Sequence, residues 1–370
     1  MSAPDLSSPL TALIRQSIAG AGGWLPFDRF MAMALYEPGL GYYTGGRRKF
    51  GMLPSQGSDF VTAPEMSPLF GRALARQVAQ ALRASGCTDV MEFGAGSGAL
   101  AAHLIAELDA LGAGLLRYRI VELSAELRER QRERLAAWGD RVEWLDALPE
   151  HIDAVVVGNE VLDAMPVQLI AFDGQTWRER GVVVAGEGFA FADRDSMLRP
   201  PLQESGHGGF VPDTVTEIHP QAEAFMRTLA RKLRRGAAFF IDYGFPEAEY
   251  YHPQRRGGTL MCHQGHLADA DPLVAVGDKD ITAHVNFTGI ALAGQDAGLV
   301  VLGYTSQANF LLNCGIAELL QGASLGERAM AHRLLAEHEM GELFKVVGFA
   351  PLNAPFDAVG FERGDRSHKL

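Results

Sequence analysis

Short apolar runs alternate with amphipathic stretches through the middle of the chain. Runs at residues 90–93, 119–122, 142–145 and 154–157 contain valine, isoleucine and aromatic residues and predict strands. The stretches between them carry apolar residues at helical spacing, as in residues 100–111. Strands that alternate with helices in this way are typical of an α/β fold with a mainly parallel sheet.

The later part of the chain predicts the remaining elements of this core. A helix over about residues 220–235 is expected to end at Gly236 and to lead into a strand at 238–241. The chain is expected to end with two further strands, at residues 343–347 and 356–359.

Two regions interrupt the alternation. One is rich in glycine, valine and phenylalanine and predicts inserted hairpins, and the other is rich in histidine, glycine, proline and aspartate and predicts a lid or cap. The expected organisation is an N-terminal helical or lid segment at 1–60, a core at 61–250 with the hairpin insert at about 172–215, a cap or substrate insert at 251–335, and final core strands at 336–370.

Composition narrows the class of protein. Of the 370 residues 47% are hydrophobic, enough for a sizeable core, and the net charge of −12 argues against nucleic-acid binding. Three scattered cysteines give no disulfide framework. No signal sequence, basic transit segment or apolar run of about 20 residues is apparent, so we expect a cytoplasmic protein without a membrane span.

A glycine-rich turn follows the first predicted core strand. It runs from Glu92 to Gly98 with the sequence EFGAGSG and directly precedes a predicted helix. Glycines let the backbone approach a nucleotide-like ligand closely. Gly94, Gly96 and Ala99 also fit the dinucleotide pattern GxGxxA, so a nicotinamide-dependent oxidoreductase stays open. Glu92 inside the strand and Gly98 after the turn favour an S-adenosylmethionine-dependent methyltransferase.

Polar residues at the ends of the later strands are candidates for cofactor contacts. Glu122 ends the second predicted strand, where a carboxylate accepts hydrogen bonds from both hydroxyls of a ribose. Asp146 ends the third and is predicted to contact the adenine amino group, and Asn159 follows the fourth. Acids without a ligand remain the alternative for Glu122 and Asp146.

The segment after the fourth strand is the candidate reacting end. Ligands bind beyond the carboxyl ends of the strands in such sheets, so residues 159–166 are expected to face the transferred methyl group. Glu160 and Asp163 are predicted to hold a cationic guanidinium or ammonium group and to orient its nitrogen. A helix-capping acid and a turn acid are the structural alternative.

Histidines in the predicted cap raise the question of a metal site. Cys262, His263, His266 and His284 match no standard zinc spacing, so no metal is predicted. His284 is either a base or orienting group for the acceptor, or a structural histidine.

An ordered set of segments resembles the MidA-like methyltransferases, the family of a mitochondrial protein arginine methyltransferase that assists assembly of respiratory complex I. The resemblance spans nearly the whole chain. The segments are residues 34–44, 57–65, 70–71, 92–98, 121–124, 158–166, 241–244, 280–287 and 340–346.

The resemblance implies a fold, a cofactor and an acceptor. The fold would be a Rossmann-like seven-strand class I methyltransferase core with an added, partly helical lid or insert domain. The donor would be S-adenosyl-L-methionine, and the acceptor an arginine in a protein partner of the complex I subunit type. The resemblance also implies that Asp59, Thr62 and His284 are site residues.

Two departures from the family pattern motivate an alternative function. Residues 262–267 lack the arginines of the family, and Asn286 replaces an aspartate. We expect both the segment 262–267 and position 286 to contact the acceptor. The alternative is an assembly or interaction protein that keeps the methyltransferase fold with weak or no catalysis.

Overall fold

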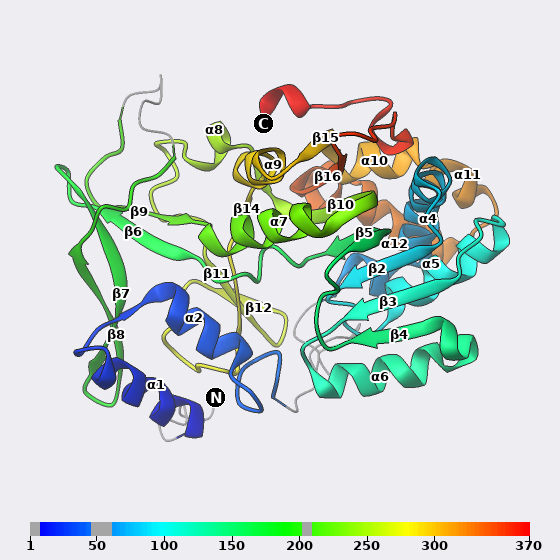
Figure 1. The fold of residues 1–370 in the computed structure, drawn as a ribbon. Coiled ribbons are helices and arrows are strands. Elements are labelled where there is room, and N and C mark those ends of the chain that lie inside the picture. The colour runs from blue at the N-terminus through cyan, green and yellow to red at the C-terminus, as the bar shows by residue number, and fades with distance from the viewer. Residues whose placement is uncertain (1–7, 46–60, 202–208) are drawn as a thin grey trace.

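A sheet of eight strands, seven of them in one continuous path, forms the centre of the molecule (Figure 1). The computed structural model describes residues 8–45, 61–201 and 209–370. Four neighbouring strand pairs run parallel, and two antiparallel pairs complete the sheet on one side, which confirms the predicted seven-strand α/β core. In spatial order the strands are β15 (Leu299–Ser306), β16 (Phe344–Pro351), β10 (Leu233–Phe245), β5 (Ile152–Asn159), β2 (Asp89–Phe93), β3 (Arg117–Val121) and β4 (Val142–Leu145).

The boundary predicted at Gly236 is wrong. Helix α7 (Pro220–Lys232) ends four residues earlier, and β10 begins at Leu233. Gly236 lies inside β10 with φ 120°, and a Cβ there would lie 1.8 Å from the carbonyl oxygen of Ala154. The glycine therefore permits the close approach of β10 to β5, and does not end a helix.

The C-terminal part of the sheet also differs from the prediction. β16 confirms the strand expected at 343–347, but residues 356–359 form no strand. The edge position belongs to β15, which pairs antiparallel with β16 although its residues fall in the range predicted as a cap. The cap prediction at 251–335 therefore included a core strand.

Helices cover both faces of the sheet. On one face lie α4 (Pro68–Ser85) and α5 (Ala99–Ala110), and on the other lie α7 and α9 (Phe287–Asp296) (Figure 1). The remaining core helices are α3 (Ala63–Met66), α6 (Ala125–Leu135), α10 (Gln307–Asn313), α11 (Ile316–Gln321) and α12 (Leu325–Leu335).

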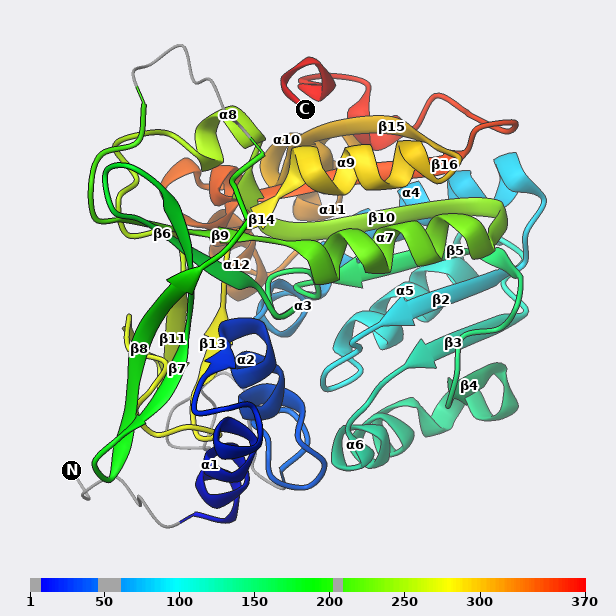
Figure 2. The same ribbon diagram turned by 60° about the vertical axis from the view of Figure 1, so that its left-hand side comes forward.

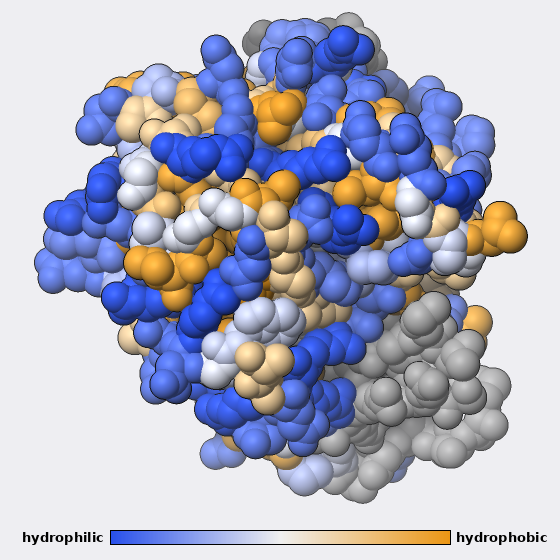
Figure 3. Space-filling model, turned by 90° about the vertical axis from the view of Figure 1, so that its right-hand side faces the viewer, coloured by the Kyte–Doolittle hydropathy of each residue, from blue (hydrophilic) through white to orange (hydrophobic). Residues whose placement is uncertain are grey.

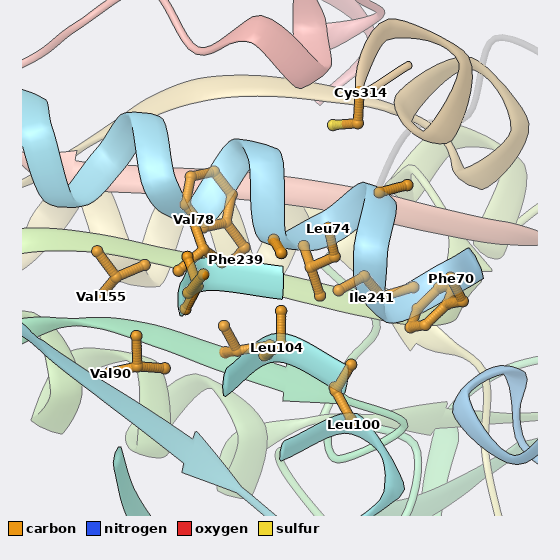
Figure 4. Close-up of a cluster of buried hydrophobic side chains, with 14 of the residues drawn as sticks. Phe70, Leu74, Val78, Val90, Leu100, Leu104, Val155, Phe239, Ile241 and Cys314 are labelled. Atoms are coloured by element: carbon orange, nitrogen blue, oxygen red, sulfur yellow. The ribbon is translucent and has the colours of Figure 1, made fainter. Parts of the chain in front are cut away.

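Helix α4 shows how the sequence specifies these elements. The Ser67 side chain accepts a hydrogen bond from the backbone N–H of Leu69 at 3.2 Å, with proline next in the chain, so both N-terminal signals are present. Phe70, Leu74 and Val78 recur at helical spacing, are buried and point toward the sheet (Figure 4). This packing fixes α4 behind the strands that lead to the glycine-rich turn.

A second sheet forms an accessory unit beside the core (Figure 2). Its strands pair antiparallel in the described residues, and helices α1 (Pro9–Gly20) and α2 (Phe27–Tyr36) pack against it. Its strands are β1 (Leu25–Pro26), β6 (Gln168–Phe172), β7 (Trp177–Ala185), β8 (Gly188–Asp195) and β9 (Thr214–Ile218). The accessory unit thus joins the N-terminal helices to the inserted hairpins.

A small third sheet connects the accessory unit to the core. Its order is β12 (Leu267–Asp269), β11 (Met261–Gln264) and β13 (Asp280–Thr282), and it follows the short helix α8 (Glu247–Tyr250). The next strand, β14 (Val285–Asn286), pairs parallel with the end of β10. The backbone N–H of Ala283 donates to the carbonyl of Asp163 at 3.0 Å, so the end of this sheet contacts the loop after β5.

The surface has a mixed character. On the face shown in Figure 3, apolar side chains lie in small groups separated by hydrophilic ones. None of the helices in the described ranges has the length and apolar character needed to cross a membrane.

Candidate cofactor and acceptor site

A cavity of about 1060 Å³ lies at the carboxyl ends of β2, β3, β5 and β10. The core contributes the glycine-rich turn and the loops after the strands. The opposite walls come from α2, which packs against the accessory sheet, and from the third sheet. This is the edge of the sheet at which open α/β folds bind their ligands. The cavity brings together most of the site residues predicted from the sequence.

The glycine-rich turn has a backbone that favours glycine. Gly94, Gly96 and Gly98 have φ values of 63°, 53° and 81°, in the left-handed region. Gly94 and Gly96 line the cavity, whereas Gly98 caps α5 outside the lining. A Cβ at Gly98 would lie 3.5 Å from the Cα of Gln131, so this glycine sits where the turn packs against α6.

Glu92 is buried beneath the turn. The hydroxyl of Tyr118 donates to its Oε2 at 2.6 Å. Burial raises the pKa of Glu92 to about 8, against the opposing effect of this hydrogen bond. A carboxyl group with so high a pKa lacks a cationic partner in the described protein, and a ligand ammonium group would provide one.

Glu122 is held at the end of β3 by two neighbours. It accepts hydrogen bonds from the backbone N–H of Ser124 at 2.9 Å and from Nε2 of Gln131 at 3.1 Å. The same Nε2 donates to the carbonyl of Gly96 at 2.8 Å, so Gln131 ties the turn to the end of β3. Glu122 lines the cavity, and its contact with a ribose stays a prediction.

The other predicted cofactor residues divide into three groups. Thr62 and Asn159 line the cavity. Asp146 does not: its side chain is 91% exposed and forms an ion pair with Arg128 at 2.5 Å. Asp59 lies outside the described residues.

The loop after β5 holds Glu160 in a strained conformation. Glu160 has φ 54°, a left-handed value that is uncommon for a residue with a Cβ. Its backbone N–H donates to the carbonyl of Ile241 at 2.9 Å, and Nδ2 of Asn159 donates to its Oε1 at 2.9 Å. These contacts direct the Glu160 side chain to the cavity, which it lines.

Asp242 fixes the rest of this loop from the neighbouring strand. Its Oδ2 accepts hydrogen bonds from the backbone N–H groups of Val161, Leu162 and Asp163 at 3.1, 2.9 and 3.3 Å. The pKa of Asp242 is raised by burial and then by the nearby carboxyl groups of Asp163 and Glu160. Sequence reasoning did not assign Asp242 to the site, although it lies in a segment that carries the family resemblance.

Glu160 and Asp163 form an acidic pair in the cavity. Burial raises the pKa of Glu160 to about 8 and that of Asp163 to about 6, with Asp163 adding to the effect on Glu160. The hydroxyl of Tyr243 donates to Oδ2 of Asp163, while Oδ1 is buried without a partner among the described residues. A cation in the cavity would satisfy this oxygen and lower the pKa of both carboxyl groups, which favours their ionised forms.

Two stacked tyrosines form the wall beside this pair. The rings of Tyr36 and Tyr43 lie 5.5 Å apart with an interplanar angle of 18°. The Tyr36 hydroxyl donates to the carbonyl of Ala164 at 2.8 Å, and the Tyr43 hydroxyl to the carboxylate of Asp280 at 2.9 and 3.0 Å. The sequence did not assign Tyr36, Tyr43 or Asp280 to the site, although all three lie in segments that carry the family resemblance.

His284 lines the same end of the cavity. Its ring centroid lies 5.2 Å from those of both Tyr243 and Phe245. Burial, followed by the charges of Arg255 and Lys345, lowers the pKa of His284 to about 4, so the imidazole is neutral at neutral pH. Its Nδ1 is buried without a hydrogen-bond partner among the described residues.

The residues that depart from the family pattern mostly lie outside the cavity. Asn286 is buried and accepts a hydrogen bond from the backbone N–H of Gly289 at 3.3 Å, as the N-cap of α9. It does not line the cavity, and neither do Gln264 and Leu267, although His263 does. Position 286 therefore lies outside the cavity lining, and its contact with an acceptor stays an untested expectation.

A glycine-rich turn, a carboxylate after β3 and an acidic pair after β5, all around one cavity, define the class of S-adenosylmethionine-dependent methyltransferases. Residues 73–305 match a family described as "putative S-adenosyl-L-methionine-dependent methyltransferase". The match covers more than half of the chain, and the chain belongs to this family.

Solved structures agree with this assignment. The chain is 52% identical to a superfamily member from Burkholderia thailandensis whose crystal structure is bound to S-adenosyl-homocysteine. That comparison covers 100% of this chain and 99% of the other, with a TM-score of 0.93. The protein is therefore a methyltransferase with S-adenosylmethionine as its cofactor, and the nicotinamide alternative is excluded.

Curated relatives carry a more specific name. The chain is 27% identical to the mouse (Mus musculus) protein "Protein arginine methyltransferase NDUFAF7, mitochondrial", over 91% of this chain and 82% of the relative. It is 25% identical to the human (Homo sapiens) protein of that name, over 84% of this chain and 74% of the relative.

These names correct the expected location. From the sequence we expected a cytoplasmic protein, but the matched relatives are named as mitochondrial proteins. The cytoplasmic prediction is therefore contradicted.

Proposed function

We propose that this methyltransferase is a protein arginine N-methyltransferase. The observation that carries the proposal is the pair Glu160 and Asp163, which share one cavity with the glycine-rich turn and have pKa values raised by burial. A guanidinium is always cationic and presents N–H donors in a planar fork that fits carboxylates. The names of the curated relatives support the same acceptor. The family resemblance makes a subunit of respiratory complex I the first acceptor to test.

The cofactor end of the cavity is assigned to the turn and its neighbours. Gly94 and Gly96 let the backbone approach the cofactor, Glu122 accepts from the ribose hydroxyls, and Glu92 faces the amino group. Asn159 and Thr62 complete this end because both line the cavity. Gly98 acts indirectly, by placing the turn against α6. Asp146 is not included, because it pairs with Arg128 away from the lining.

The acceptor end is assigned to the acidic pair. S-adenosylmethionine, when bound, supplies an electrophilic methyl group on a sulfonium. Glu160 and Asp163 hold the guanidinium so that one nitrogen is in line with that methyl group. Glu160, once ionised by its pairing with the guanidinium, would accept the proton that the nitrogen releases on methylation. His284 orients the acceptor from the same end of the cavity.

A methyl-transfer assay with an exchange at Glu160 tests the proposal. The purified protein is incubated with labelled S-adenosylmethionine and arginine-containing peptides, and methylarginine is identified after hydrolysis. Glu160→Gln is expected to lower kcat by about 100-fold, the scale of losing one electrostatic group, with unchanged affinity for S-adenosyl-homocysteine. The control is Glu150→Gln, an exposed acid ahead of β5. Full turnover in Glu160→Gln would contradict the assignment.

A further inference from the structure

One arginine lines the otherwise acidic cavity. Among the described lining residues, six carry carboxyl groups, and Arg255 is the only arginine or lysine. The described residues place no acid in ion-pair contact with Arg255, and its Nε is buried without a hydrogen-bond partner. A guanidinium that lines the cavity with a buried Nε lacking an acceptor can bind an anion that the described protein does not supply.

Aromatic contacts hold this guanidinium in place. Its central carbon lies over the ring of Phe245, 4.3 Å from the centroid. The ring of Phe245 contacts His284, and that of His284 contacts Tyr243, the residue that donates to Asp163. Arg255 therefore lies at the acceptor end of the cavity, separated from the acidic pair by these rings.

The turn that carries Arg255 is fixed by the accessory sheet. The backbone N–H of Val215 in β9 donates to the carbonyl of Arg256 at 2.8 Å. The buried carboxyl group of Glu217, also in β9, accepts from the backbone N–H groups of Thr259 and Leu260 at 2.8 and 3.0 Å. Arg255 is thus preorganised, and preorganised groups bind ligands with less loss of conformational entropy.

The position of Arg255 argues against a role toward the cofactor. Its ring partner Phe245 ends β10, whereas the glycine-rich turn follows β2, two strands away in the sheet. The anion is therefore expected on the acceptor and not on S-adenosylmethionine.

We propose that Arg255 is a carboxylate subsite, which binds an acidic group of the acceptor that lies one or two residues from the methylated arginine. The carboxylate is either a glutamate or aspartate side chain or the carboxyl terminus of the acceptor. This inference rests on the proposed arginine methyltransferase function and deepens it, since it specifies the residue context that the enzyme selects.

Peptide binding and turnover with matched variants test the subsite. One set of amidated peptides carries a single arginine with a glutamate one or two residues before or after it. The neutral counterparts carry glutamine in place of that glutamate. A further peptide ends in a free carboxylate near the arginine. Each is titrated calorimetrically into the complex with S-adenosyl-homocysteine and assayed for methylation. The variants are Arg255→Gln and Arg255→Lys, and the control is Arg256→Gln, an exposed neighbour.

The subsite predicts a specific pattern. The wild type binds a carboxylate-bearing peptide about tenfold or more tightly than its neutral counterpart, the scale of one charged hydrogen-bonded pair. Arg255→Gln removes this preference, Arg255→Lys keeps part of it, and Arg256→Gln keeps all of it. The peptide that responds identifies the source of the carboxylate, and affinity for S-adenosyl-homocysteine stays unchanged in each variant.

Three results would overturn the inference. If the wild type binds all the peptides with equal affinity and methylates them, the proposed subsite is wrong while the arginine methyltransferase function stands. If Arg255→Gln weakens S-adenosyl-homocysteine binding instead, the residue belongs to the cofactor. If the wild type neither binds nor methylates any arginine peptide, the proposed function fails, and the subsite fails with it.

Discussion

Glu160 combines two unfavourable features in one residue. Its backbone has a left-handed φ of 54°, and burial raises its pKa to about 8. Strained backbone in such a residue costs about 1–3 kcal/mol and is found at functional sites. The surrounding hydrogen bonds maintain the arrangement, so the stability of the free protein is reduced to keep a carboxyl group ready for a cation.

The pKa of Glu160 predicts a pH-dependent effect on stability. Its pKa is about 8 in the folded protein and ordinarily 4.5. Its contribution to the free energy of unfolding is therefore fully present below pH 4.5 and is lost as the pH rises toward 8. Glu160→Gln does not titrate, so we expect it to match the wild type near pH 5 and to gain about 1–3 kcal/mol over it at pH 8.

Urea unfolding of both proteins at pH 5, 6.5 and 8 measures this difference. Glu150→Gln, at an exposed site, should follow the wild type at every pH. A difference between Glu160→Gln and the wild type that does not change with pH would show that the Glu160 carboxyl group is not held protonated in the folded protein.

Single residues also show where sequence reasoning ends. Glu122 and Asp146 were predicted on the same grounds, as acids at the ends of adjacent strands. Glu122 faces the cavity because Ser124 and Gln131 hold it there, whereas Arg128 draws Asp146 to the surface. The pattern of the sequence locates the end of a strand, but the partner that directs its side chain depends on tertiary contacts.

At the scale of elements, β10 organises the acceptor end. Oδ2 of Asp242 accepts hydrogen bonds from three backbone N–H groups in the loop after β5. Its Oδ1 accepts a fourth from the backbone N–H of Tyr243 at 2.9 Å. The carboxyl group of Asp242 thus accepts from four backbone N–H groups and sets the course of the loop that carries Glu160 and Asp163.

Exchange of Asp242 should affect both stability and turnover. Asp242→Ala leaves these N–H groups without an acceptor, and we expect it to lower the free energy of unfolding by about 3 kcal/mol or more. Asp242→Asn keeps one acceptor oxygen and should lose less of both stability and kcat. Unfolding curves and kcat with saturating acceptor measure this. Full kcat in Asp242→Ala would show that the loop keeps its conformation without this anchor.

The parallel strands were the elements most accessible to prediction. β2, β3, β4 and β5 lie near their predicted positions. β2 and β5 are buried almost throughout, and strands buried on both faces leave nearly continuous apolar runs. The end of α7 was misplaced, since Gly236 resembles a helix stop although it serves a close contact with β5. β15 was not predicted, because nothing in its local pattern indicates pairing with the distant β16.

At the scale of the whole molecule, the cavity lies where the core, the N-terminal helix α2 and the third sheet meet. The core supplies the cofactor end, and the other two parts supply much of the acceptor end. Pattern and motif indicated the first, but the walls made by Tyr36, Tyr43 and Arg255 depend on contacts between distant segments. A ligand that fills the cavity should therefore stabilise the molecule as a whole.

Thermal unfolding with S-adenosyl-homocysteine measures that stabilisation. At a ligand concentration of 100 times Kd, we expect a gain of about 2.7 kcal/mol. Gly96→Arg should abolish the gain, because φ at this position is 53° and the glycine lines the cavity. Gly112→Arg is the matched control, with φ 58° and open space around the Cβ. Equal shifts in both variants would place the cofactor elsewhere.

The central claim is that Glu160 and Asp163 receive a guanidinium in the cavity that holds the cofactor. The most direct test is calorimetric titration of an arginine peptide into the complex with S-adenosyl-homocysteine at pH 7, in buffers of different ionisation enthalpy. With a pKa of about 8, Glu160 is mostly protonated in the free protein and ionises when it pairs with the guanidinium. The account predicts release of about one proton per peptide bound in the wild type, and a much smaller release in Glu160→Gln. Peptide binding with no proton release, or with equal release in both proteins, would contradict it.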